Sequence, residues 1–360
     1  MTKKYTVALD CMGGDRAPQI VIEGADLMAA SNQDIYFLLF GDSTKINPIL
    51  QNSRYLKGRY TIHHTDEAIS ADEKPSIALR RGTKSSMRLA INSVKNKEAD
   101  VIISAGNTGA LMAMSKIVLR PLPSIDRPAI VTSIPNKKKK ATVMLDMGAN
   151  IECGANVLFQ FAVMGHAFSR SVLKIENPKV GILNVGSEDE KGHEELRNTA
   201  SMLKNSHLSN DFYGYVEGDD ITKGTVDVVV TDGFTGNVTL KSIEGTVKLM
   251  SSIIKEAFSN SIFSKLGYLL AMNSISKATK SMDPRMHNGA MLVGLNGVVV
   301  KSHGSTDRIG FANAIKVAIS LVENKINEQI TQELKSAEAT IQATTTKNTE
   351  DLNDKNQKQN

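Results

Sequence analysis

The chain contains few of the residues from which disulfide-rich, aromatic-lined or membrane-spanning proteins are built. Only Cys11 and Cys153 are cysteine among 360 residues, and tryptophan is absent. Two cysteines form no disulfide framework, and such low usage suits a reducing cytoplasm. Aromatic residues make up 5% of the chain, which disfavours a platform for stacking nucleobases or sugars. No uncharged apolar run approaches the roughly 20 residues that span a bilayer, and the N-terminus lacks the apolar region of a signal peptide, so we expect a cytoplasmic protein.

Several catalytic and binding motifs are also missing. The sequence has no G-x-G-x-x-G after a predicted strand, no Walker A motif and no G-x-S-x-G elbow. Its histidines and cysteines lack metal-ligand spacing, and His193-Glu194 is not followed by the second histidine of H-E-x-x-H. We interpret Cys11 as a small buried residue rather than a nucleophile. We therefore expect no metal and no cofactor, and a reaction for which positioning and electrostatic stabilisation suffice.

The charge of the chain is modest and locally clustered. Its formal net charge is +5, which we attribute to solubility rather than to nucleic-acid binding. A four-lysine turn, 137–140, is interpreted as a solvated tip, with docking of an acidic partner as the alternative. The same two interpretations apply to the basic face of an amphipathic segment that begins at Pro75, formed by Arg80, Arg81, Lys84 and Arg88.

Short apolar runs alternate with segments of helical periodicity, which indicates an α/β protein with one large domain or two smaller ones. Asn296-Gly297 predicts a hairpin turn between two of the strands. Strands are predicted at 5–10, 35–40, 60–64, 101–104, 129–134, 141–145, 180–185, 212–216, 228–230, 290–295 and 298–300. Helices are predicted at 20–30, 46–56, from 75 to about 94, and at 110–119, 156–169, 193–203, 238–258 and 315–326.

Polar, glycine-rich loops follow six of the predicted strands. The clearest, Asp232-Gly-Phe-Thr-Gly-Asn237, joins the strand 228–230 to a helix. Free backbone N–H groups and the helix dipole favour an anion there, and glycine lets the backbone approach it closely. Ligands of open α/β sheets bind outside the carboxyl ends of the strands, so we predict that the six loops line one anion-binding cleft. The other five loops follow Leu9, Ile103, Leu145, Val185 and Val300.

Taken together, the motifs in these loops are specific enough to indicate a family. They are Asp10-x-Met-Gly-Gly-Asp-x-Ala-Pro18, Ser104-Ala-Gly-Asn-Thr-Gly-Ala110, Arg127-Pro-Ala129, Leu145-Asp-Met-Gly-Ala-Asn150, Asp232-Gly-Phe-Thr-Gly-Asn237 and His303-Gly-Ser305. The sequence over about residues 5–325 resembles the bacterial phosphate acyltransferase family. That family transfers a fatty acyl group from acyl carrier protein to inorganic phosphate, and the product is acyl phosphate for phospholipid synthesis.

The resemblance implies a fold and a set of partners. The fold is a three-layer α/β/α architecture on a largely parallel mixed sheet, similar to phosphate acetyltransferases and isopropylmalate dehydrogenases. We expect it over residues 1–330, as one domain or two subdomains around a cleft, followed by a polar, disordered tail over 331–360. The expected partners are acyl carrier protein, inorganic phosphate, a second copy in a homodimer and a downstream membrane glycerol-3-phosphate acyltransferase, with the protein cytoplasmic or peripheral at the inner face of the membrane. The family pattern has Ala at Cys11 and His at Arg16, so a mechanism that needs an imidazole in that loop is disfavoured.

The chemistry of the expected reaction assigns roles to individual residues. Phosphate is itself the nucleophile, and the leaving thiol, with a pKa near 8.5, needs little help from an acid. Lys191 supplies positive charge, Asn237 is a donor to the oxyanion or to phosphate, and Asp232 orients a donor or caps the following helix. His303 either protonates the departing sulfur or is structural. Phosphate and substrate binding is assigned to Gly13, Gly14, Asn107, Thr108, Gly109, Asn150, Thr235 and Gly236.

The apolar segment Phe258–Met272 is interpreted as a helix packed on the core or on a partner subunit, and second as a contact with a membrane surface or an acyl chain.

Three rival functions stay open. An acyltransferase using a short-chain acyl-coenzyme A would act on acetyl-coenzyme A. An oxidoreductase of the isopropylmalate dehydrogenase type would change nicotinamide absorbance. A non-catalytic scaffold would bind acyl carrier protein without consuming its thioester.

Overall fold

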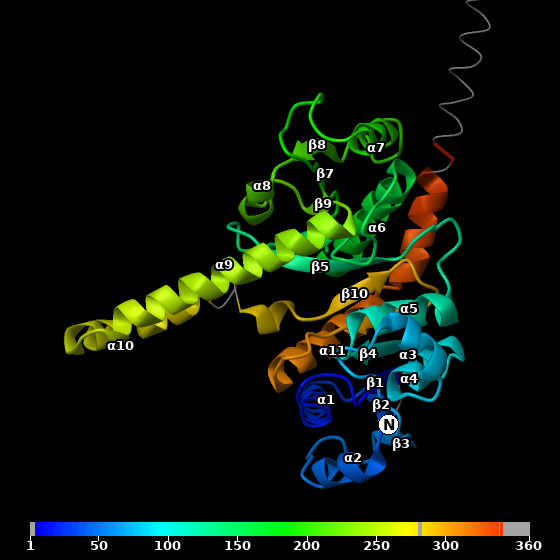
Figure 1. Ribbon diagram of the computed structural model, residues 1–360, viewed down its shortest axis with the longest axis vertical. Coiled ribbons are helices and arrows are strands. Elements are labelled where there is room, and N and C mark those ends of the chain that lie inside the picture. The colour runs from blue at the N-terminus through cyan, green and yellow to red at the C-terminus, as the bar shows by residue number, and fades with distance from the viewer. Residues whose placement is uncertain (1–3, 280–282, 338, 341–360) are drawn as a thin grey trace, which may run out of the picture.

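The chain folds around one mixed sheet with helices on both faces, as a computed structural model shows (Figure 1). The structure describes residues 4–279, 283–337 and 339–340. The order of the eleven strands is β3-β2-β1-β4-β11-β10-β5-β6-β9-β7-β8. The strands are β1 Tyr5–Asp10, β2 Ile35–Gly41, β3 Tyr60–His64, β4 Val101–Ser104, β5 Ala129–Pro135, β6 Ala141–Leu145, β7 Val180–Leu183, β8 Phe212–Val216, β9 Val228–Val230, β10 Ala290–Val293 and β11 Val298–Lys301.

The helices alternate with the strands as predicted. They are α1 Gln19–Ser31, α2 Ser43–Leu50, α3 Pro75–Arg81, α4 Ser86–Lys95, α5 Thr108–Leu119, α6 Ala155–Leu173, α7 Glu194–Lys204, α8 Gly218–Lys223, α9 Gly233–Ser259, α10 Ile262–Thr279 and α11 Arg308–Glu323, with a 3₁₀ turn at Pro284–His287. The predicted three-layer α/β/α architecture is confirmed.

The sheet consists of two parallel sets that run in opposite directions. Strands β1 to β4 and β11 form one set, and β6, β9, β7 and β8 form the other. Between them, β10 is antiparallel to both β11 and β5, and β5 is antiparallel to β6. Both predicted hairpins, β5–β6 and β10–β11, are confirmed. The carboxyl ends of the two parallel sets therefore point to opposite edges of the sheet.

The central strands are buried on both faces, which explains why they are almost continuously apolar. Along β1, Val7 and Leu9 face one hydrophobic cluster and Ala8 faces the other. The first cluster includes residues of α1, α6 and α11, and the second includes residues of α3, α4 and α5. The core is thus divided by the sheet, and the loops at the strand ends lie between helices of both layers.

Two predicted helices differ from the structure. The segment that begins at Pro75 forms two helices because the chain turns at Gly82, where an added Cβ would lie 2.4 Å from the Ile69 side chain. The Ser85 hydroxyl then caps α4 by accepting the N–H of Arg88 at 3.3 Å. The helix predicted over 46–56 begins earlier, at Ser43, and ends at Leu50.

The tail predicted from residue 331 begins later in the structure. Residues 326–337 form a helical segment that lies against the first hydrophobic cluster. Ile326, Ile330, Leu334 and Ala337 are buried along one side, at the spacing of helical turns. This apolar stripe is sparse among polar residues, which is why composition alone suggested a tail. Residues 341–360, where disorder was expected, lie outside the described part of the chain.

Helices α9 and α10 form a long hairpin that extends away from the sheet (Figure 1). Only the beginning of α9 meets the core, through the partly buried Leu240 and Ile243. Farther along, large apolar side chains are exposed, among them Leu249, Phe263 and Leu270. The predicted packing of 258–272 on the core of its own chain is therefore wrong for these described residues. No helix in the described ranges combines the length and apolarity needed to cross a membrane.

Candidate functional site

The loops after β1, β4 and β11 form a first group around a buried carboxylate. The strand register aligns Asp10 with Ser104, and Ser104 with Lys301. Asp10 is buried, and the hydroxyls of Ser86 and Ser104 each donate a hydrogen bond of 2.6 Å to it. Burial raises the pKa of Asp10, while the bonds from Ser104 and Ser86 oppose that shift. The carboxylate thereby connects the end of β1 to β4 and to the start of α4.

The predicted glycines of this group allow close contact between the loop backbones. A Cβ at Gly13 would lie 2.7 Å from the backbone nitrogen of Gly106. Gly14 has a φ of +110° and leaves space for the backbone oxygen of Gly304, which accepts the N–H of Asp15 at 3.0 Å. Gly13 and Gly14 are therefore required for packing, whether or not they also bind a ligand.

Lys301 is a partly buried cation in this group and was not predicted as a site residue. It ends β11, and its ammonium donates a hydrogen bond to the backbone oxygen of Ser302. Burial lowers the pKa of Lys301 to about 8, with the negative charges of Asp10 and Asp15 acting against the shift. A lysine at the end of the apolar run Val298–Val300 was a signal in the sequence, because strand ends carry the ligands of α/β proteins.

The predicted phosphate loop at the start of α5 uses its asparagine for structure. Asn107 caps the helix by accepting the N–H of Ala110 at 3.0 Å. Its amide donates to the backbone oxygens of Ala71 and Glu73 at 3.0 and 2.9 Å. Asn107 therefore ties the loop before α3 to α5, and Thr108, which is exposed, is the better placed of the two to contact a ligand.

His303 lies in the loop after β11. Its backbone N–H donates to the Asn288 side chain at 2.9 Å, and ring Nδ1 accepts the N–H of Ser305 at 3.3 Å. The neutral ring therefore carries its proton on Nε2. Partial burial lowers the pKa of His303, against the negative charge of Glu244 on α9. The neutral ring is the dominant form at neutral pH, and its Nε2–H can donate a hydrogen bond.

The loops after β6, β9 and β7 form a second group, and the first two of them are centred on the buried Asp146. This carboxylate accepts the backbone N–H groups of Ile130, Ala149 and Asn150 at 2.9, 3.0 and 2.7 Å. It also accepts the Asn150 side-chain amide at 2.9 Å. Burial raises the pKa of Asp146, and these hydrogen bonds oppose the shift. Asp146 was part of a quoted motif but was not assigned to the site.

Two loops of the second group, those after β6 and β9, contact each other through their backbones. The Asn150 carbonyl accepts the N–H of Gly233 at 2.7 Å. A Cβ at Gly236 would lie 1.9 Å from the carbonyl oxygen of Asp146, so only glycine fits there. The Asn150 amide also donates to the Pro128 carbonyl at 2.8 Å. The structure thus brings the predicted residues Asn150 and Gly236 together, with the Asn150 side chain committed to internal bonds.

The start of α9 confirms the capping interpretation of Asp232. One carboxylate oxygen accepts the N–H of Thr235 at 2.8 Å, and the other accepts the Thr235 hydroxyl at 2.9 Å. Asn237 follows one turn later, exposed and adjacent to Gly148. Within the described residues its amide has no hydrogen-bond partner, so Asn237 is the side chain of this helix start with free donors.

Lys191 lies in the loop between β7 and α7. Its ammonium forms an ion pair of 2.8 Å with Glu188, and its side chain is half-exposed. The hydrogen bond that the ammonium donates to the Glu188 carboxylate raises the pKa of Lys191. The contacts that the structure gives Lys191 are with its own loop, including Gly186, and not with the predicted phosphate loop at Asn107–Gly109.

The six loops, which are predicted to line one cleft, leave the sheet at two opposite edges. The six loops form two groups because β10 and β5 reverse the direction of the sheet between them. Helix α9 connects the groups: it begins beside Asp146, and its Glu244 is close enough to His303 to affect the pKa of that ring. Sequence motifs alone contain no information about strand direction, so the division was not foreseeable from them.

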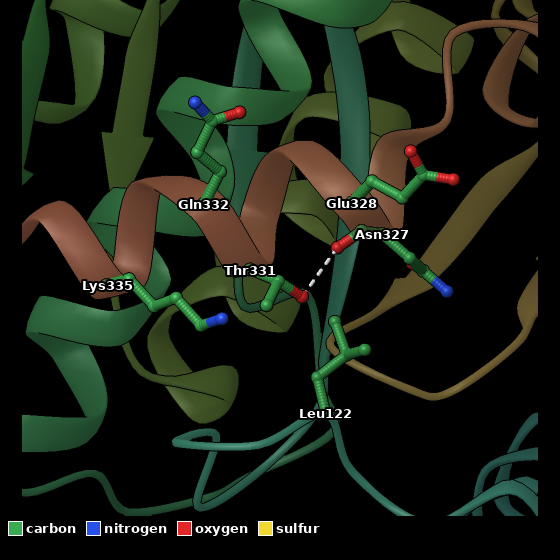
Figure 2. A pocket seen from close by; sticks show the side chains of 6 residues that line it. All are labelled: Leu122, Asn327, Glu328, Thr331, Gln332 and Lys335. Carbon is green, nitrogen blue, oxygen red and sulfur yellow. Dashed lines mark hydrogen bonds between the residues drawn. The ribbon is translucent and has the colours of Figure 1, made fainter.

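Two hollows occur among the described residues, one far from both groups and one beside the loop after β7. Figure 2 shows one of about 410 Å³, formed between the helical segment 326–337 and Leu122. The other, of about 580 Å³, lies beside β8 and the loop that contains Glu188. Neither hollow is lined by a predicted site residue.

One trio of metal-ligand types occurs among the described residues, at Asp42, His64 and Asp66. Asp42 caps α2 by accepting the N–H of Thr44 at 2.9 Å. Nδ1 of His64 accepts the N–H of Ser43 at 3.2 Å, so the neutral ring carries its proton on Nε2, which faces Asp66 at 3.4 Å. The His64 ring and the Asp42 carboxylate are therefore already engaged in bonds within the protein. None of the predicted site residues belongs to the trio.

The fold defines a class, the mixed α/β proteins that share the fold of phosphotransacetylases. A phosphotransacetylase from Streptococcus pyogenes superimposes with a TM-score of 0.60 over 89% of this chain and 94% of its own, at 16% identity. The EutD phosphotransacetylase from Staphylococcus aureus gives a TM-score of 0.56 over 90% and 95%, at 15% identity. At these identities the likeness concerns the fold alone.

Sequence comparison is more specific. Residues 5–329 match the model of a family described as fatty acid synthesis protein. The phosphate acyltransferase of Paramagnetospirillum magneticum is 52% identical over 94% of this chain and 97% of its own length. That of Rhodospirillum centenum is 52% identical over 95% and 96%. The chain belongs to the phosphate acyltransferase family and is an acyltransferase.

Proposed function

We propose that this enzyme transfers a long-chain fatty acyl group from acyl carrier protein to inorganic phosphate. The product is acyl phosphate, which supplies glycerophospholipid synthesis. Relatives named phosphate acyltransferase at 52% identity support acyl transfer to phosphate. The matching family of fatty acid synthesis proteins supports a fatty acyl donor.

The observation that carries the proposal is the polar start of α9. The free amide of Asn237, the dipole of the helix start and the closely packed glycines Gly233 and Gly236 are suited to an oxyanion or a phosphate. Nearby, burial and the charge of Asp146 raise the pKa of the Cys153 thiol to about 11. A thiol with that pKa is a poor nucleophile at neutral pH, which favours direct attack by phosphate over an acyl-enzyme.

In this mechanism the chain positions two substrates and stabilises charge. Asn237 donates to the oxyanion that forms at the thioester carbonyl, and Asp232 acts through the helix start that it caps. Thr108 and Gly109 at the start of α5 bind phosphate. The Nε2–H of His303 donates to the departing sulfur. Gly13, Gly14, Asn150, Thr235 and Gly236 hold the loops in place.

Acyl carrier protein is acidic, and the basic face of α3 and α4 is a suitable docking surface. Arg80, Arg81 and Lys84 are exposed there. The same helices adjoin the first group, because a Cβ at Gly109 would lie 2.7 Å from the ring of Pro75 at the start of α3. A carrier bound to these cations would deliver its thioester next to the strand-end loops.

The hairpin of α9 and α10 suits a role in assembly. We propose that it pairs with a second copy in a homodimer, which would cover its exposed apolar side chains. The proposed protein is cytoplasmic, or peripheral at the inner face of the membrane, where a downstream glycerol-3-phosphate acyltransferase would consume the unstable acyl phosphate.

The test is mass spectrometry of the purified protein with palmitoyl-acyl carrier protein, with and without phosphate. We expect phosphate-dependent acyl phosphate and no acylated protein. Asn237→Ala should lower turnover by roughly 10²-fold, as loss of an oxyanion donor does. The matched control is Asn52→Ala, an exposed asparagine in the turn after α2.

Each other outcome identifies the part of the proposal that fails. An acylated residue would keep the reaction and refute direct attack. Binding of the carrier without thioester loss would favour the scaffold alternative. Turnover of acetyl-coenzyme A with no activity on the carrier substrate would favour the short-chain alternative.

A further inference from the structure

Three large apolar side chains are exposed in the second group of loops. Ile151 is 72% exposed, Val185 is 79% exposed and Phe234 is 63% exposed. Each belongs to the loop after one of three neighbouring parallel strands, β6, β7 and β9. Single exposed apolar residues are common on protein surfaces, but several around one polar site indicate a binding surface.

A backbone hydrogen bond places two of these residues on neighbouring stretches of chain. The carbonyl of Asn150 accepts the N–H of Gly233 at 2.7 Å, and Ile151 and Phe234 are the next residues in each strand-end loop. Val185 lies two residues beyond the end of β7, whose Ile182 is aligned with Val230 of β9. The three side chains therefore rise from adjacent strand ends, around the loops centred on Asp146.

We call Ile151, Val185 and Phe234 the apolar rim. Its surroundings differ from those of the exposed side chains of the α9–α10 hairpin. The hairpin residues lie far along the projecting helices, whereas Phe234 is in the first turn of α9, next to the Asp232 cap. The second group thus combines polar loops with an apolar rim. A fatty acyl thioester likewise has a polar end and an apolar end. With its carbonyl near Asn237, the first methylenes of its chain would lie within reach of the rim.

We propose that Ile151, Val185 and Phe234 bind the carbonyl-proximal part of the fatty acyl chain and thereby favour long-chain donors. The inference rests on the proposed function and adds to it a set of specificity-determining residues. The rim is open to solvent in the free enzyme, and binding of the chain would remove apolar surface of both partners from water. A two-carbon acyl group is too short to gain from this contact.

The experiment compares palmitoyl- and acetyl-acyl carrier protein as donors for acyl phosphate formation. Phe234→Ala should lower kcat/KM for the palmitoyl donor about tenfold and change the acetyl value less than about twofold. Phe234→Leu should restore most of the preference, because an apolar side chain is kept. Tyr55→Ala, which truncates an aromatic residue 50% exposed near β3, is the matched control and should leave both values unchanged.

The remaining outcomes are distinguishable. An unchanged ratio of the two kcat/KM values in Phe234→Ala would overturn the proposal that the rim binds the acyl chain. A change of sedimentation coefficient with an unchanged ratio would also overturn it, because the side chain would then contact a second copy. Ile151→Ser provides a second variant if circular dichroism shows that Phe234→Ala is unfolded. Absence of acyl phosphate from the wild type with either donor would refute the proposed function itself.

Discussion

At the scale of single residues, the buried ionisable groups explain how the loops are held. Asp10 and Asp146 each accept several hydrogen bonds from neighbouring loops, and a carboxylate is retained in the interior only when it is satisfied in this way. Lys301 differs, because among the described residues its ammonium donates to the backbone oxygen of Ser302 and to no carboxylate. It is therefore the group whose charge should affect stability most clearly.

The lowered pKa of Lys301 predicts a pH-dependent stability. Below about pH 8 the folded protein holds a buried ammonium, at a cost of about 3 kcal/mol for a fall from 10.5 to about 8. Between these values the folded protein loses the proton while the unfolded chain keeps it. The unfolded state then binds more protons, so the free energy of unfolding rises with pH, and above 10.5 the cost is gone.

Lys301→Met removes the group, and chemical denaturation from pH 7 to 10.5 measures the difference. At pH 7 the variant should be more stable than the wild type by up to about 3 kcal/mol, reduced by whatever the attraction between Lys301 and Asp10 contributes. The difference in the free energy of unfolding should shrink by about 3 kcal/mol as the pH rises to 10.5. Lys116→Met, at an exposed position on α5, should show no such convergence. Parallel stability curves for wild type and Lys301→Met would contradict a lowered pKa.

At the scale of elements, α9 serves two regions of the molecule. Its first turn closes the second group through the Asp232 cap and the fit of Gly236 against Asp146. Its later part leaves the sheet and packs on α10, with the rings of Phe258 and Tyr268 5.2 Å apart. A helix of 27 residues that contacts the core only at its beginning needs another partner for its apolar side chains.

The hairpin therefore predicts self-association that one charge should disrupt. Leu269 is 66% exposed on α10, and Leu269→Asp should shift a dimer to monomer in sedimentation velocity, because an unpaired carboxylate is costly in an apolar interface. Ser252→Asp, an exposed polar position on α9, is the matched control and should remain dimeric. A monomeric wild type would refute the dimer. Loss of vesicle binding in Leu269→Asp, with unchanged sedimentation, would assign the hairpin to a membrane surface.

At the scale of the whole molecule, the sequence predicted elements better than their assembly. The strands and both hairpins follow from apolar runs and from turns such as Asn296-Gly297. The division into two groups of loops was not predictable, because it depends on the direction of β10 and β5 in the finished sheet. The capping role of Asp232 followed from local chemistry. The partners of Lys301 and Asp146 are far away in sequence and required the fold.

The helical segment 326–337 provides the last link between distant parts of the chain. The Glu333 carboxylate bonds to His166 at 2.8 Å and to Arg170 at 3.1 Å, both on α6. The other ring nitrogen of His166 faces Asp211 at 3.4 Å. On another side of the same segment, the Asn327 amide donates to the Leu295 carbonyl near the β10–β11 turn at 2.9 Å. The segment thus joins α6, which covers the second parallel set, to the turn beside β11 of the first.

This arrangement predicts that a single substitution at Glu333 lowers the stability of the whole fold. Glu333→Ala should reduce the free energy of unfolding by roughly 3 kcal/mol, because it removes the carboxylate that bonds to Nδ1 of the buried His166 and to Arg170. Glu328→Ala removes an exposed ion pair with Lys325 from the same segment and should cost less than about 0.5 kcal/mol. Denaturation followed by circular dichroism measures both variants. Equal losses in the two would show that the segment is only loosely attached, whereas a selective loss in Glu333→Ala, in a single transition, would show that it folds together with the sheet.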